Sequence, residues 1–496
     1  MAKQISTQEI TKHAHENDIW IVVNGKVYDV TEFAPDHPGG AEIIYHFAGR
    51  DASQKYNSTH SPSLIKDIND SLVGDLDTTT ITEQWRGQNE TPTSTTTASE
   101  SQLYQKPTLD DIINLDDFEA VAKNTFSPKS WAYHSGAAND CFTRDENRDF
   151  FRRIWLRPAI MRDVSRVNTQ STLFGCNLDI PVFVAPVGAA KMSHEEGELP
   201  LARGAASSGI IHCISTMASY SLAEILDQTP SQAFYQLYIN TDRSKTEALV
   251  RLAEKSGKVK ALFVTADLPV MSKREADERI KLDEGTQWIN VAKDNNNNNN
   301  NPTGKKKSAG LAKANSSFID STLNWDDLRW LRSISNLPIV LKGVQRAEDA
   351  ILAMRAGFDG IVISNHGGRA ADTTPPTILV LLEIHRYCPE VFGKMKVLVD
   401  GGFRRGSDIV KAICLGASAV GLGRSFAFAL NYGQDGVEHA VSLIKEEIET
   451  ATQLVGMTEL FRDASPSYIN TAGLDHLLPP NHDSTIGGSV RRSNKL

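Results

Sequence analysis

His366 and Arg369 stand three positions apart, shortly after the apolar run 361–363, and their side chains suit acid–base and carboxylate chemistry. A histidine can move a proton near neutral pH. An arginine can hold a carboxylate through two parallel hydrogen bonds. Residues 361–364 are typical of a buried parallel strand, and in such sheets chemistry gathers at the C-terminal ends of the strands. A strand that ends in a simple polar turn is the alternative, so other parts of the chain must decide.

A second pair of histidines suits a different kind of chemistry. His37 opens the run His-Pro-Gly-Gly, and His60 follows 23 positions later on a separate expected loop. Two histidines on separate loops can supply both axial ligands to one haem iron, which leaves the iron to carry electrons instead of binding oxygen. Residues 19–30 precede them and predict a β-hairpin, because two β-branched apolar runs flank an Asn-Gly pair.

The composition sets limits on the function. The 496 residues carry a net charge of −9, which argues against a nucleic-acid-binding protein. No apolar run approaches the roughly 20 residues of a membrane span. Five separated cysteines without a C-x-x-C pair indicate ordinary thiols in a reducing compartment. The N-terminus lacks the patterns of a secretory or transit signal, so we expect a cytoplasmic location.

Apolar, β-rich runs alternate with helical stretches through the larger part of the chain. Eight repeats of strand and helix predict a (β/α)8 TIM barrel. A doubly wound sheet is the alternative, but its G-x-G-x-x-G turn after the first strand is missing. The expected strands are 182–187, 211–215, 233–238, 261–266, 339–342, 360–364, 396–399 and 419–422.

Seven of these eight strands end in polar or glycine residues, and a barrel would bring all of the ends to one mouth. The last two ends form a unit of their own: Asp400-Gly401-Gly402 with Arg404, and Gly423-Arg424. Barrels commonly bind a phosphate through backbone N–H groups at this place. Glycine turns with unrelated arginines would be the plainer interpretation of either segment alone.

The composition also indicates separate parts. We expect a small α+β domain at 1–76, a flexible linker at 77–107, the barrel domain at 108–475 and a C-terminal tail at 476–496. The asparagine run 295–301 and the lysines that follow it predict a disordered insertion.

Residues 1–76 resemble the cytochrome b5 family in the hairpin, the His-Pro-Gly-Gly motif and the spacing of the second histidine. The resemblance implies that His37 and His60 are the axial ligands of a b-type haem. This part carries eleven acidic and six basic residues, and an acidic face would attract a basic redox partner such as cytochrome c.

Residues 110–475 resemble the FMN-dependent α-hydroxy-acid dehydrogenases, a family that includes glycolate oxidase and L-lactate dehydrogenases. The matching motifs are Tyr133 with Gly136-Ala137 and Asn139-Asp140, the run 235–238, Thr265 with Asp267, Arg274-Glu275, the run 342–344, the run 364–369, the run 400–406 and Gly423-Arg424. The Ser-Asn-His-Gly-Gly-Arg element is highly specific to that family.

The resemblance implies a role for each matching residue. His366 would be the base, with Asp267 stabilising its imidazolium and raising its pKa. Arg369, Tyr133 and Arg274 would hold the substrate carboxylate, and Tyr238 would bond to the hydroxyl group that is oxidised. The FMN contacts would come from Pro186, Val187, Gly188, Ser215, Gln236, Thr265 and Lys342, and the phosphate contacts from Asp400, Gly401, Gly402, Arg404, Gly423 and Arg424.

The function expected from both resemblances is oxidation of an L-2-hydroxy acid, with L-lactate to pyruvate as first choice. Electrons would pass from FMN through haem b to cytochrome c or a similar acceptor. An oxidase that makes hydrogen peroxide and a haem carrier with an inactive barrel are the alternatives. Ala370-Ala371 and Val187-Gly188 depart from the family pattern and put a strict lactate preference in doubt. The resemblance further implies a homotetramer, and it makes the mitochondrial intermembrane space the alternative location.

Overall fold

The computed structural model describes residues 3–15, 17–37, 41–57, 60, 64–82, 85, 104–280 and 319–480. The asparagine run, Pro38 to Gly40 of the histidine motif, residues 86–103 of the expected linker and the tail after 480 lie outside the described residues. None of the described helices is both long and apolar enough to cross a membrane.

The small N-terminal domain is built on the predicted hairpin. Strands β3 (Asp18–Val23) and β4 (Lys26–Asp29) pair antiparallel around Asn24 and Gly25, which both have positive φ angles of 52° and 78°. Such a pair matches the two-residue turn that the right-handed twist of a hairpin favours. The sheet runs β1-β6-β4-β3-β2, with β5 beside β3. Its other elements are β1 (Gln4–Ile5), β2 (Ala14–His15), β5 (Arg50–Asp51), β6 (Leu72–Leu76), α1 (Thr7–Ile10), α2 (Ala41–His46) and α3 (Ser53–Asn57).

Residues beyond 77, where the sequence predicts that the linker begins, also pack on the small domain. Residues Thr78–Thr80 form a 3-10 turn, and Thr80 Oγ1 accepts a hydrogen bond of 2.9 Å from the backbone N–H of Thr7. Trp85 is only 7% exposed and packs in the apolar cluster that contains Ile5 and Val27. The small domain therefore holds its own C-terminal extension, since a buried tryptophan supplies packing that the polar composition around it does not suggest.

The large domain is the predicted barrel. Eight parallel strands form a closed ring in sequence order, and the last strand pairs with the first. The strands are β10 (Val182–Val184), β11 (Ile211–Ser215), β12 (Ala233–Leu237), β13 (Val259–Thr265), β14 (Ile339–Val344), β15 (Gly360–Ile363), β16 (Lys396–Asp400) and β17 (Ala419–Leu422). The fold class predicted from the alternating pattern is confirmed, and the expected strand bounds differ by only a few residues.

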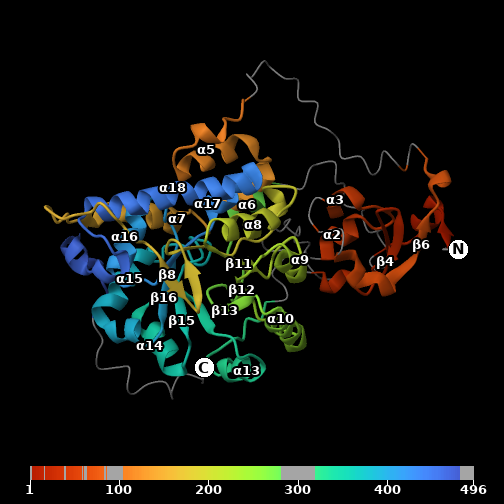
Figure 1. The fold of residues 1–496 in the computed structure, drawn as a ribbon. Helices are drawn as coiled ribbons and strands as arrows, with labels where there is room; N and C mark the ends of the chain where they lie inside the picture. Colours follow the sequence, from red (N-terminus) through yellow and green to blue (C-terminus); the bar gives the residue numbers. More distant parts are fainter. Residues whose placement is uncertain are drawn as a thin grey trace.

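Helices surround the barrel, and the small domain lies to one side of it, next to α9 (Figure 1). The long helix α18 runs across the barrel and packs against α8 and α16. The helices of this domain are α5 (Leu115–Thr125), α6 (Pro128–Ser135), α7 (Phe142–Asp149), α8 (Leu199–Ser207), α9 (Leu222–Asp227), α10 (Arg243–Lys255), α11 (Glu275–Arg279), α13 (Asp327–Ile334), α14 (Ala347–Ala356), α15 (Thr377–Tyr387), α16 (Gly406–Cys414), α17 (Arg424–Ala429), α18 (Gly433–Leu454) and α19 (Leu460–Asp463).

Two layers of side chains fill the barrel interior. The lower layer is apolar and includes Cys213, Phe234, Phe263, Val340, Val362 and Leu398. A hairpin of β8 (Ser171–Leu173) and β9 (Cys176–Leu178) closes this end, where the ring of Phe174 lies 5.8 Å from that of Phe234.

Residues two positions further along the strands point to the same side, because side chains alternate with a period of two. They form the upper layer, which is polar and consists of Ser215, Gln236, Thr265, Lys342, Ser364 and Asp400. The period of the strands therefore places the chemistry at the C-terminal mouth.

Candidate functional site

The predicted base and its carboxylate lie together at this mouth. His366 follows β15, Asp267 follows β13, and His366 Nδ1 is 3.1 Å from Asp267 Oδ1. A carboxylate acceptor fixes a proton on Nδ1 and leaves Nε2 free to accept another. His366 has a φ of 59°, an uncommon left-handed conformation, and Gly367 and Gly368 continue it at 63° and 80°. These three residues make a sharp turn at the end of β15.

Burial, followed by the nearby ammonium of Lys342, lowers the pKa of His366 to about 4 against the opposing effect of Asp267. The imidazole is therefore neutral at physiological pH, the form that a base requires. The expectation that Asp267 raises this pKa is correct for that single interaction, but burial outweighs it. Burial would also raise the pKa of Asp267, yet Lys342 and His366 hold it below its ordinary value.

Lys342 is a buried cation between two carboxylates. Its Nζ lies 3.8 Å from Asp267 Oδ2 and 3.7 Å from Asp400 Oδ2, and it donates a hydrogen bond of 3.1 Å to Ser364 Oγ. Burial alone would lower its pKa, but the two carboxylates raise it above the ordinary value. A fixed ammonium at the mouth of the barrel can stabilise negative charge on a flat ring bound above it.

Arg274 and Arg369 form a site for an anion. Arg274 is buried and Arg369 is half-buried, and the loss of hydration followed by the charge of Arg274 lowers the pKa of Arg369 to about 10. Nε of Arg274 has no hydrogen-bond partner among the described residues. Arg369 donates to the carbonyl oxygens of Tyr133 and His134 at 2.6 Å each, and its guanidinium lies 5.6 Å from the centre of the Tyr133 ring. Two crowded guanidinium groups favour a bound carboxylate, which would relieve their repulsion.

Tyr238 completes the predicted substrate contacts at the end of β12. It is 7% exposed, and burial together with the Asp267 carboxylate raises the pKa of its phenol. The phenol keeps its proton at all working pH values and is available as a hydrogen-bond donor.

The polar upper layer also contains a connected amide and hydroxyl network. Gln236 accepts hydrogen bonds from Ser215 Oγ at 3.3 Å and from the N–H of Thr216 at 3.2 Å, and it donates to Thr265 Oγ1 at 2.9 Å. Gly188 comes so close to Met217 that an added Cβ atom would lie 2.9 Å from its side chain. These groups line the mouth where the sequence places a flavin, and their hydrogen bonds hold them rigid.

Two of the expected phosphate contacts, Arg404 and Arg424, make hydrogen bonds within the protein. Arg404 pairs with Glu119 of α5 at 2.6 Å, and Arg424 donates to the carbonyl oxygens of His134, Gly136 and Gly367. The pKa of Arg424 is lowered well below its ordinary value by burial and then by other arginines. Arg424 uses three of its five N–H groups in these bonds. A dianionic phosphate suits this excess of buried positive charge.

The two expected haem ligands face each other in the small domain. The ring centres of His37 and His60 lie 5.9 Å apart with an angle of 80° between the ring planes. Two metal–nitrogen bonds of about 2 Å each place imidazole rings at about this separation. Burial lowers the pKa of His60 to about 4, so its imidazole is neutral, as a ligand must be. The spacing of the two rings therefore fits one iron between them.

Several residues that support the site were given no role by the sequence motifs above. Ser364 accepts from Lys342 Nζ and also from the backbone N–H of His366 at 3.0 Å, so it fixes both groups. Asn147 of α7 and Asn365 exchange two side-chain hydrogen bonds of 2.8 and 3.0 Å. In the sequence, only the polar run Ser364-Asn365 at the end of the strand could have indicated the role of Ser364. The pairing of Asn147 with Asn365 depends on how α7 packs against the barrel.

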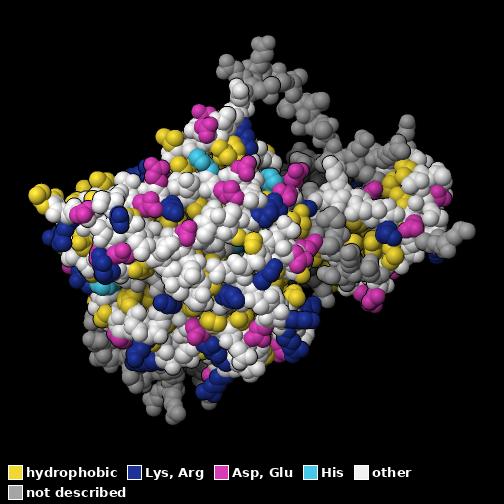
Figure 2. Space-filling view, viewed as in Figure 1, with side chains coloured by type: hydrophobic (Ala, Val, Ile, Leu, Met, Phe, Trp, Pro, Cys, Tyr) yellow, Lys and Arg dark blue, Asp and Glu magenta, His cyan; other side chains and the backbone are white. Residues whose placement is uncertain are grey.

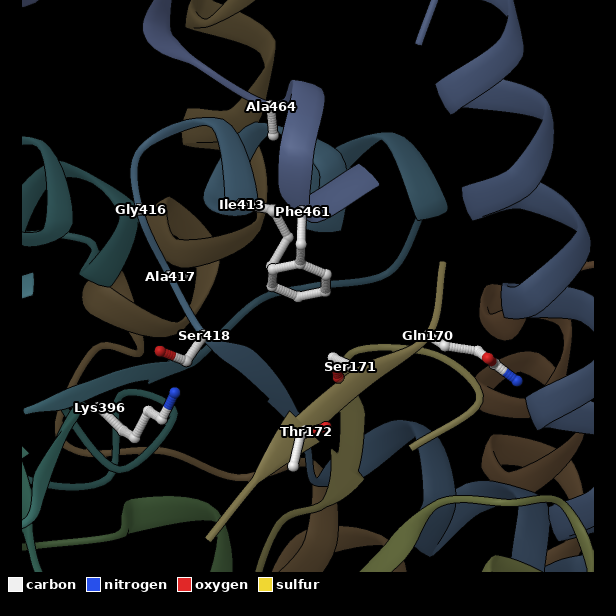
Figure 3. A pocket seen from close by; sticks show the side chains of 10 residues that line it. All are labelled: Gln170, Ser171, Thr172, Lys396, Ile413, Gly416, Ala417, Ser418, Phe461 and Ala464. Atoms are coloured by element: carbon white, nitrogen blue, oxygen red, sulfur yellow. The ribbon is translucent and has the colours of Figure 1, made fainter. Parts of the chain in front are cut away.

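A separate cavity of about 500 Å³ lies at the opposite end of the barrel (Figure 3). It is lined by residues at the beginnings of β16 and β17 and in β8, including Lys396, Ser418 and Thr172. Because the chemistry lies at the C-terminal ends of the strands, this cavity is not part of the site. On the face drawn in Figure 2, acidic and basic side chains are interspersed over the barrel.

Comparison with known proteins agrees with this geometry. Residues 122–471 match the family model described as FMN-dependent dehydrogenase, and residues 6–77 match that of the cytochrome b5-like heme/steroid binding domain. An L-lactate dehydrogenase (cytochrome) of Wickerhamomyces anomalus is 36% identical over 98% of this chain and 85% of its own length. Its counterpart in Saccharomyces cerevisiae is 39% identical over 92% of this chain and 78% of its own length. The structure of a flavocytochrome b2 variant with pyruvate bound superimposes with a TM-score of 0.67 at 38% identity, covering 79% of this chain and 94% of that one.

Proposed function

Because the chain belongs to the FMN-dependent dehydrogenase family and carries a cytochrome b5-like domain ahead of it, we propose that it oxidises an L-2-hydroxy acid, L-lactate to pyruvate in the first place. Electrons then pass from FMN through haem b to cytochrome c. One observation carries the proposal: a single chain contains both sites. The first is the His366–Asp267 pair beside two crowded arginines, and the second is the His37–His60 pair of rings.

The cofactors supply the electron chemistry: FMN accepts two electrons from the substrate, and haem b passes electrons on singly. The protein supplies position and protons. Arg369 and Arg274 hold the carboxylate, which fixes the orientation of the α-carbon and its hydroxyl group. Tyr238 donates a hydrogen bond to the substrate oxygen. His366 Nε2 takes up the proton that leaves the substrate, and Asp267 stabilises the imidazolium that forms.

Lys342 acts on the cofactor from the protein side. Its Nζ is surrounded by Ser364, Asp267 and Asp400, so it cannot turn away from the mouth of the barrel. A fixed ammonium favours the reduced, anionic form of a flavin, and it therefore promotes electron transfer out of the substrate.

The decisive experiment mixes the purified holoprotein with L-lactate in the absence of oxygen and records the haem spectrum. We expect the haem to become reduced after the flavin, and pyruvate to form. An oxidase with an idle haem domain would leave the haem oxidised and produce hydrogen peroxide once air is admitted. That outcome would refute electron transfer through the haem.

A haem carrier with an inactive barrel is the other candidate function. The short His366–Asp267 contact, the raised pKa of Lys342 and the unpartnered Nε of Arg274 support a working barrel instead. A panel of L-lactate, glycolate, mandelate and longer hydroxy acids, scored by haem reduction, tests both activity and substrate preference. An inactive barrel would give no haem reduction with any of them.

We further propose a homotetramer and a cytosolic location, with the mitochondrial intermembrane space as the alternative. The support for assembly is a group of exposed apolar side chains: Ile160 is 83% exposed, Met161 96% and Leu454 71%. The N–H of Ala159 bonds to the carbonyl of Val455, which brings these two segments together. Light scattering after gel filtration measures the assembly, and cell fractionation measures the location.

A further inference from the structure

Among the described residues, Lys191 of the barrel domain donates two hydrogen bonds to the small domain. Lys191 lies in the 3-10 turn η6 (Ala190–Met192) that follows β10, three residues after Gly188 at the mouth. Its Nζ donates hydrogen bonds of 3.0 Å to the carbonyl oxygen of Asn57 and 2.8 Å to that of His60. His60 is one of the two expected iron ligands. A single side chain thus connects the backbone of a haem ligand to the segment that lines the flavin site.

The barrel holds Lys191 in a fixed position. The buried carboxylate of Glu198 accepts hydrogen bonds of 2.9 Å from the backbone N–H groups of Ala190 and Ser219. Ser219 Oγ in turn accepts from the N–H of Lys191 at 3.2 Å. The ammonium also lies 5.1 Å from the centre of the Tyr220 ring, at a distance suited to a cation–π contact. The fully buried carboxylate of Glu198 thus joins the turn that carries Lys191 to the loop that carries Ser219.

Two like charges also lie at this contact between the domains. Lys55 of α3 lies close to Lys129 of α6, and the pKa of Lys55 falls to about 8 because of burial and then the charge of Lys129. Two ammonium groups that face each other oppose close approach. A contact held by hydrogen bonds and opposed by like charges is one from which a tethered domain can separate and return.

We propose that Lys191 is the docking residue that holds the haem-binding domain against the barrel for electron transfer from flavin to haem. The inference rests on the proposed function and adds to it a named positioning residue. Lys191 contacts neither the substrate nor the base. Its loss therefore affects the step between the cofactors and spares the oxidation of the substrate.

The test uses the holoprotein and the variant Lys191→Met in anaerobic stopped-flow mixing with L-lactate. Flavin reduction should stay within twofold of the unaltered protein, while haem reduction should slow at least tenfold. Lys191→Arg should recover much of the loss, because its guanidinium can donate to the same two carbonyl groups. Lys258→Met is the matched control, since Lys258 donates to the Leu226 carbonyl at 2.7 Å within the barrel domain itself, and it should leave both rates unchanged.

A second readout does not depend on activity. Hydrogen–deuterium exchange of the amides in 53–57 and 190–192 should become at least fivefold faster in Lys191→Met and stay unchanged in Lys258→Met. If Lys191→Met and the unaltered protein show equal rates of haem reduction or of exchange, the docking role is overturned. Slower flavin reduction in Lys191→Met would also overturn it, and would indicate a general disturbance of the loop. Failure of the unaltered protein to reduce its haem at all would instead overturn the proposed function.

Discussion

Nδ1 of His366 lies 3.1 Å from Oδ1 of Asp267, and the other oxygen of the same carboxylate lies 3.8 Å from Nζ of Lys342. The base and the cation expected beside the flavin therefore share one buried counter-ion. When His366 takes up a proton, Asp267 stabilises that charge while Lys342 opposes it. The arrangement keeps the imidazole neutral before the reaction and makes protonation costly without substrate.

Replacement of His366 by Gln removes the base and keeps a polar side chain of similar size. We expect the rate of flavin reduction by L-lactate to fall by about 10³-fold, the range in which general bases contribute. The KM should change far less, because the arginines still bind the carboxylate. Stopped-flow absorbance of the flavin measures the rate. His385→Gln in α15, away from the mouth, is the control, and full turnover by His366→Gln would disprove the assignment of the base.

The pH dependence of kcat/KM should show the neutral imidazole as the active form. Because the pKa of His366 is lowered to about 4, activity should stay level from neutral pH down to about pH 5 and fall as the pH decreases through 4. A fall centred at pH 6.5, the ordinary value for histidine, would contradict the burial seen here.

The same group makes stability depend on pH. Between pH 4 and 6.5 the unfolded chain binds this proton and the folded protein does not, so the free energy of unfolding should rise with pH across that window. Urea unfolding at several pH values measures this effect. The variant His366→Gln should show a smaller rise, because it lacks the titrating group.

Replacement of Lys342 by Met should make the flavin harder to reduce. The loss of the ammonium removes the stabilisation of an anionic ring, so the midpoint potential should become more negative and flavin reduction should slow by about 10²-fold. A redox titration with dye mediators measures the potential. Lys342→Arg keeps the charge beside Asp267 and Asp400 and is the control. An unchanged potential in Lys342→Met would show that this cation does not act on the flavin.

Replacement of His60 by Ala should separate the two halves of the reaction. The variant should lose the spectrum of a six-coordinate b-type haem and the reduction of cytochrome c, while L-lactate still reduces the flavin. Absorbance of the purified protein and stopped-flow mixing measure the two properties. His15→Ala is the control, because His15 is an exposed residue in β2 of the same domain. A normal haem spectrum in His60→Ala would rule out His60 as a ligand.

Replacement of Gly368 by Ala should destabilise the barrel around the base. Gly368 has a φ of 80°, and an added Cβ atom would lie 2.5 Å from the backbone nitrogen of Arg144. We expect a loss of about 2–4 kcal/mol in the free energy of unfolding, from the strain of the conformation together with the clash. Gly257→Ala is the control: its φ is 65°, but nothing lies within 4 Å of the added atom, so it should lose only about 1 kcal/mol. Urea unfolding of both variants measures the difference.

The sequence by itself determined the barrel, and it predicts His366 as the base. Strands alternate with a period of two, so an apolar residue in the barrel such as Phe263 implies that Thr265 faces the same interior. The Ser-Asn-His-Gly-Gly-Arg run then marks the end of β15, and the spacing of His37 and His60 marks the haem-binding domain. These features are spacings and short motifs along the chain, so the sequence alone contains them.

Only the tertiary structure decided which groups pair and what charge they carry. Arg404 pairs with Glu119, 285 positions away, because α5 packs beside that end of the barrel. Burial outweighs Asp267 in setting the pKa of His366, and Lys191 meets the carbonyl of His60 across two domains. Such contacts depend on how distant elements pack and on how much water they exclude. Neither the packing of distant elements nor the exclusion of water can be obtained from the spacing of residues along the chain.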